Sequence, residues 1–60
     1  MNLQVIEYYE SLLKIEIMEM QYTGTFQTLG ELIEQYVGQD ANHKNDILTA
    51  YKNVMKELIG

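Results

Sequence analysis

Hydrophobic side chains recur at every third or fourth position between Leu3 and Met20, in a segment without glycine or proline. This spacing places them along one face of an α-helix. The stripe consists of Leu3, Ile6, Leu13, Ile17 and Met20, with Val5, Tyr9 and Leu12 beside it. Glu10 is the polar residue that interrupts it. We expect a long amphipathic helix that is capped by Asn2 and whose apolar face must be covered.

The second half of this segment also fits a β-strand. Polar and apolar side chains alternate over residues 14–17 and again over residues 18–22, which is the period of a strand, and the first run contains two β-branched isoleucines. The rest of the pattern contains no second convincing strand, so a strand over residues 13–22 would have to pair with another subunit. We predict a helix here and keep an intersubunit strand as the alternative.

A short amphipathic segment follows. Gly24 is expected to end the first helix. Thr28 and Glu31 have the spacing of a capping box, and Thr25 is the alternative N-cap. A second helix should therefore run from residue 26 or 29 to residue 37 and end at Gly38. Its apolar stripe consists of Leu29, Leu32, Ile33, Tyr36 and Val37.

The polar segment 39–45 is predicted to connect this helix to a C-terminal one. The apolar stripe of the C-terminal helix consists of Ile47, Tyr51, Val54 and Leu58, widened by Leu48, Met55 and Ile59. Its candidate N-caps are Asp40, Asn42 and Asn45. Gly60 stands where a helix-ending glycine belongs.

The sequence thus predicts one all-α domain over residues 1–60, a small helical bundle of two to three helices. A hydrophobic content of 47% favours folding over disorder, but a chain of 60 residues buries little surface. The absence of cysteine excludes disulfide bonds as an additional source of stability for this small core. We therefore expect a homodimer, with a monomeric three-helix bundle and a heteromeric subunit as the alternatives. The predicted dimer interface consists of Ile6, Tyr9, Leu13, Ile17 and Met20.

Acidic residues are concentrated in the N-terminal part of the chain. The net charge is −5, and the six glutamates and one lysine of residues 1–37 account for all of it. Without a basic patch, binding to nucleic acid or to anionic membranes is not expected. The acidic surface favours a larger protein partner with a basic surface, although such charges also serve solubility alone. The predicted partner contacts are Glu7, Tyr8, Glu10 and Glu19.

Residues suited to catalysis are scarce. His43 is the single histidine, and we expect it to be exposed in the polar connection. The glutamate pairs at i, i+3 are expected to be solvated, because no histidine or arginine cluster accompanies them. We therefore predict no enzyme activity, no metal site and no cofactor. Without a signal peptide or a membrane span, a cytoplasmic location is expected.

The chain contains no motif specific enough to indicate a family. We predict a small acidic, non-enzymatic protein-binding module that acts as an inhibitor or antagonist of a larger protein. A phage-encoded inhibitor of a host defence protein, working in the host cytoplasm, is one example of this class. The alternative is a structural or regulatory dimerisation adaptor, or an antitoxin-like protein.

Overall fold

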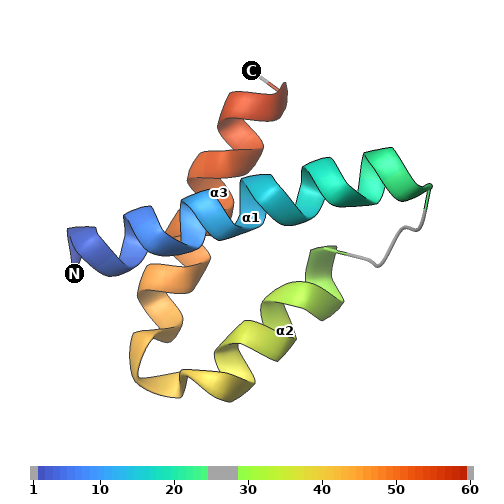
Figure 1. Ribbon diagram of the computed structural model, residues 1–60. Coiled ribbons are helices and arrows are strands. Elements are labelled where there is room, and N and C mark those ends of the chain that lie inside the picture. Colours follow the sequence, from blue (N-terminus) through green and yellow to red (C-terminus); the bar gives the residue numbers. More distant parts are fainter. Residues whose placement is uncertain (1, 25–28, 60) are drawn as a thin grey trace.

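The described part of the chain forms three α-helices (Figure 1). The computed structural model describes residues 2–24 and 29–59. In it, α1 covers Leu3–Thr23, α2 covers Leu29–Gln39 and α3 covers Lys44–Ile59, and the short 3₁₀ turn η1 at Ala41–His43 precedes α3. The all-α prediction is confirmed, and α2 has about half the length of α1, as expected. Because residues 13–22 lie inside α1, the strand alternative is wrong.

Both ends of α1 have the caps that the sequence predicts. Asn2 has an extended backbone, and its side-chain oxygen accepts hydrogen bonds from the backbone N–H groups of Gln4 and Val5 at 3.1 and 3.3 Å. At the other end Gly24 adopts the left-handed conformation with φ 71°, and its N–H donates to the carbonyl of Met20. The Asn2 N–H also donates to the carboxylate of buried Asp46 at 3.3 Å, which fixes the start of α1 against the first turn of α3.

The prediction that α2 ends at Gly38 is wrong. The helix continues to Gln39, and the N–H of Asp40 donates to the carbonyl of Tyr36 at 3.0 Å, so the helical bonding extends beyond Gly38. The predicted start at residue 26 and the candidate caps Thr25 and Thr28 lie outside the described residues, as does Gly60.

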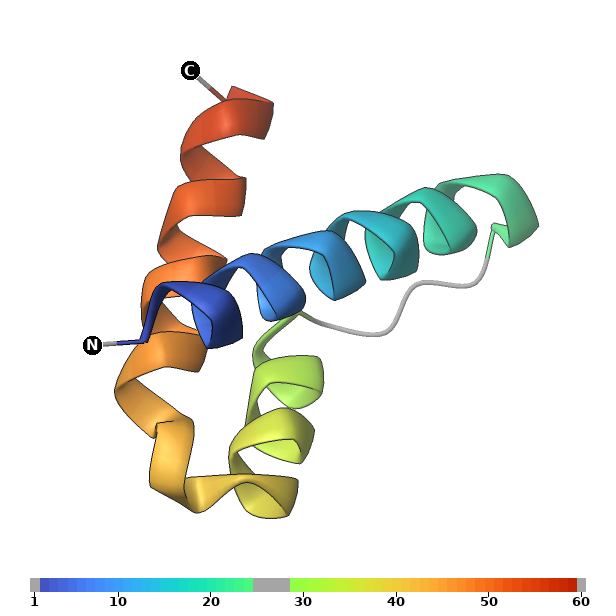
Figure 2. The ribbon, with the colours of Figure 1, turned by 60° about the vertical axis from the view of Figure 1, so that its left-hand side comes forward.

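The core lies where α3 crosses the first half of α1, with α2 closing the third side (Figures 1 and 2). Among the described residues, each helix contributes three buried hydrophobic side chains. They are Ile6, Tyr9 and Leu13 from α1, Leu32, Ile33 and Tyr36 from α2, and Ile47, Ala50 and Val54 from α3. The predicted stripes of the three helices therefore cover one another within the single chain.

The stripes are buried only near the crossing. Leu3 and Leu58, which the spacing assigns to the apolar faces of α1 and α3, are 69% and 56% exposed. Each lies near an end of its helix, and these ends project past the crossing (Figure 1). The second half of α1 extends furthest past the crossing (Figures 1 and 2).

Candidate functional site

The side of α1 that faces away from the core carries a second row of large side chains. This row, the outer stripe, consists of Tyr8, Ser11, Ile15, Met18 and Tyr22. Its four large members range from 53% exposed at Ile15 to 92% exposed at Tyr22. Because an α-helix turns once in about 3.6 residues, these positions lie opposite the buried residues of α1. The outer stripe is therefore an aromatic and apolar surface that the described residues leave open.

Tyr8 is the member of the outer stripe that the sequence already singled out as a partner contact. It is 61% exposed, and its ring packs edge-on against that of buried Tyr9, with 5.1 Å between the ring centroids. This contact orients the Tyr8 ring while leaving most of it accessible. An oriented, exposed tyrosine is well suited to an interface, since ordering it further on binding loses little conformational entropy.

Glutamates border the outer stripe on opposite sides. Glu7 and Glu19 are exposed, whereas Glu10 is half-buried and less accessible than the sequence suggested. Lys14 is the basic residue of α1, and its Nζ lies 2.6 Å from a carboxylate oxygen of Glu57 on α3. This hydrogen bond raises the pKa of Lys14. Glu57 on α3 thus compensates the positive charge of Lys14. Lys14 is therefore not available to compensate the glutamates that border the outer stripe, and that border has a net negative charge.

A pocket between α1 and α3 adjoins the outer stripe at Met18. Its volume is about 400 Å³, and its lining consists of Lys14, Ile17, Met18, Gln21, Glu57 and Leu58. Met18 and Leu58, 68% and 56% exposed, form an apolar rim on the two helices. The pocket is large enough to accept a large apolar side chain from another molecule.

The five residues predicted to form a dimer interface do not lie on the outer stripe. Three of them, Ile6, Tyr9 and Leu13, are buried in the core of the single chain, and Leu13 has no exposed surface. Ile17 and Met20 are half-buried and pack against the core. While this fold is kept, the first three cannot contact a second subunit. The homodimer itself stays a prediction.

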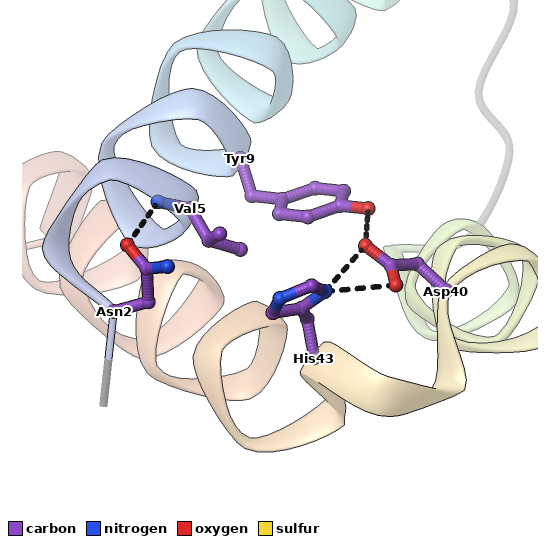
Figure 3. A network of polar contacts seen from close by, with 5 residues as sticks. All are labelled: Asn2, Val5, Tyr9, Asp40 and His43. Atoms are coloured by element: carbon purple, nitrogen blue, oxygen red, sulfur yellow. Dashed lines mark hydrogen bonds and ion pairs between the residues drawn. The ribbon is translucent and has the colours of Figure 1, made fainter.

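A polar cluster on the opposite side of the core joins α1 to the segment between α2 and α3 (Figure 3). The Tyr9 hydroxyl donates to Oδ2 of Asp40 at 3.0 Å. Nδ1 of His43 lies 2.9 and 3.0 Å from the two oxygens of the same carboxylate. Because a carboxylate can only accept, Nδ1 carries the proton. The hydrogen bond from His43 is the largest cause of the lowered pKa of Asp40.

His43 is thus half-buried and hydrogen-bonded, and the expectation of an exposed loop histidine is wrong. The sequence signal that could have indicated the cluster is the i, i+3 spacing of Asp40 and His43, while Tyr9 is 31 positions away from Asp40. The carboxylate and the imidazole form a pair also found in catalytic triads. Here, however, the hydroxyl donates to the carboxylate and not to the imidazole. The hydrogen bonds of this cluster therefore connect α1 to the segment between α2 and α3.

The described residues hold no group of three or more histidine, cysteine or carboxylate side chains arranged for a metal ion. No helix in residues 2–24 and 29–59 combines the length and apolar character needed to cross a membrane. Comparisons with protein-family models, with curated proteins and with solved structures found no match. The candidate functional site is the outer stripe together with the glutamates beside it.

Proposed function

We propose that this chain is a small acidic, non-enzymatic protein-binding module that antagonises a larger protein by covering one of its basic surfaces. The observation that carries the proposal is the outer stripe between Glu7 and Glu19. Scattered exposed apolar residues are ordinary on any protein. A row of two tyrosines, an isoleucine and a methionine along one helix face, each more than half exposed and interrupted only by Ser11, is typical of an interaction site.

An antagonist fits the chemistry of the site better than a catalyst does. The polar cluster of Tyr9, Asp40 and His43 is occupied by its own hydrogen bonds, and the outer stripe offers large contact area without reactive groups. A chain of 7.0 kDa can still occlude a functional surface by steric blockage and charge complementarity. The proposed setting is the cytoplasm, which would be that of the host if a phage encodes the chain.

The test is affinity capture from a bacterial lysate with three baits: the natural chain, Ile15→Ser and Leu48→Ser. Ile15 and Leu48 are aliphatic side chains exposed on α1 and α3, at 53% and 40%, so the two variants are matched in chemistry. We expect the natural chain and Leu48→Ser to retain one stoichiometric protein, and Ile15→Ser to retain much less. Adding the purified chain to that protein should lower its activity.

Two results would contradict the proposal. A captured protein whose activity is unchanged by the chain would indicate an adaptor and not an antagonist. Recovery of the chain alone, with a molar mass twice that of one chain in light scattering, would favour the dimerisation module. The 3–4 spacing of the outer stripe supports this second candidate function, because two copies could pair through it.

A further inference from the structure

The outer stripe has the spacing by which one α-helix packs along another. Tyr8, Ile15 and Tyr22 are seven positions apart, with Ser11 and Met18 between them, so the intervals are 3, 4, 3 and 4. This repeat keeps a row of side chains on one side of a helix over several turns, where they fit between the side chains of a neighbouring helix. A strand or a loop would match only part of such a row.

The charges beside the stripe indicate what the docking helix must carry. In heptad geometry, the positions next to the row face the flanks of the partner helix. Glu7 and Glu19 occupy such positions, and the remaining charged one, Lys14, is paired with Glu57 on α3. The flanks therefore present uncompensated negative charge, and a helix with lysine or arginine at its own flanks complements them.

A second copy of the chain fits this surface less well. It would bring a further net charge of −5, and its own outer stripe has the same glutamates at its edges. Like charges across an interface cost free energy and slow the encounter. Resting on the function proposed above, we propose that the outer stripe docks one amphipathic helix of the partner, with apolar residues at 3–4 spacing and basic residues on its flanks.

The pocket between α1 and α3 fixes where along the stripe the helix sits. Met18 belongs both to the outer stripe and to the lining of the pocket, to which Leu58 contributes from α3. A large apolar side chain on the docking helix can enter the pocket beside Met18. Such an anchor in a recess concentrates binding energy in few contacts and defines the register.

Two synthetic amphipathic peptides provide the test, both with leucine at the 3–4 positions but with either lysine or glutamate at the flanks. Each is titrated into the ¹⁵N-labelled chain and followed by its amide chemical shifts. We expect the lysine peptide to shift signals along the outer stripe and around Leu58, and the glutamate peptide to have no effect. Ile15→Ser should lower the affinity for the lysine peptide about tenfold, whereas the matched variant Leu48→Ser should leave it unchanged.

Several outcomes would overturn the inference. No shifts with the lysine peptide at millimolar concentration, equal shifts with both peptides, or shifts centred on α2 would each refute it. Shifts of the outer stripe that depend on the concentration of the chain alone would make a second copy the occupant. A natural partner that is captured equally well by Ile15→Ser would also refute the docking site, while leaving the protein-binding function intact.

Discussion

At the scale of single residues, two tyrosines in the same core have different environments. Tyr9 and Tyr36 contact each other, with 5.6 Å between ring centroids. The Tyr9 hydroxyl donates to Asp40, whereas the buried Tyr36 hydroxyl has no hydrogen-bond partner among the described residues. Burial is the main cause that raises the pKa of both, that of Tyr36 to about 12. The two phenols therefore contribute differently to stability, although both are buried.

Removing the two hydroxyls should have opposite consequences. Tyr9→Phe loses a hydrogen bond to a carboxylate and should lower the free energy of unfolding by about 1–3 kcal/mol. Tyr36→Phe removes a buried group without a partner, so stability should stay equal or rise by up to about 1 kcal/mol. Urea unfolding of both variants followed by circular dichroism measures the difference. A loss at Tyr36 as large as that at Tyr9 would mean that the Tyr36 hydroxyl is satisfied in solution.

Because of Asp40, the stability of the fold should depend on pH in the acid range. Its pKa in the folded chain is lowered, first by the hydrogen bond from His43 and then by that from Tyr9. Because the folded chain favours the ionised carboxylate, Asp40 stabilises the fold at pH values above its unfolded pKa of 3.8. This stabilisation is lost as the pH falls through the lower pKa of the folded chain. The Asp40→Asn variant should therefore have a lower melting temperature than the natural chain at neutral pH, and this difference should disappear at acid pH. A difference that is unchanged at low pH would exclude this linkage.

At the scale of elements, α1 explains why its sequence resembled a strand. Ile17 and Met20 lie on the buried side, and Ile15, Met18 and Tyr22 lie on the exposed side. A helix with apolar residues on two opposite faces alternates locally like a strand, so the period alone was ambiguous. The caps Asn2 and Gly24 could be predicted because they act over a few residues. The outer stripe was recognised only at Tyr8, because exposure depends on where α3 crosses.

Two glycines at helix ends should respond oppositely to alanine. Gly24 has φ 71°, a conformation that costs a residue with a Cβ about 1–2 kcal/mol, so Gly24→Ala should destabilise the chain. Gly38 is helical inside α2, and a Cβ there meets no atom within 4 Å. Gly38→Ala should raise stability by up to about 1 kcal/mol. Thermal melts of both variants test the pair, and a destabilised Gly38→Ala would place the end of α2 before residue 38.

At the scale of the whole molecule, the crossing of α1 and α3 explains what the sequence could and could not predict. A chain of this length was expected not to cover both long stripes by itself, and to dimerise through Ile6, Tyr9, Leu13, Ile17 and Met20. Within the single chain the first three of these residues are buried, because the stripes of α1 and α3 cover each other. Helix faces follow from periodicity, but their mutual angle depends on contacts between distant residues. The outer stripe stays exposed because it lies on the side of α1 that faces away from this crossing.

The glutamates of α1 lead to a prediction about binding kinetics. Charges at the rim of an interface mainly set the association rate, through attraction that salt screens. Replacing Glu7, Glu10 and Glu19 by glutamine should therefore slow association with the captured partner and flatten its salt dependence. Dissociation should change less, because Tyr8, Ile15 and the other apolar contacts are unaltered.

Two matched variants distinguish the effect of a charge beside the outer stripe from the effect of the net charge of the chain. Glu19→Gln and Glu34→Gln each remove one negative charge from an exposed helical position, the first beside the outer stripe and the second on α2. Stopped-flow or surface plasmon resonance at low salt should show slower association for Glu19→Gln than for Glu34→Gln. If both variants, and the triple variant, associate as fast as the natural chain, the glutamates of α1 serve solubility alone. The partner contact would then have to be sought on α3, where Leu48 and Leu58 are exposed.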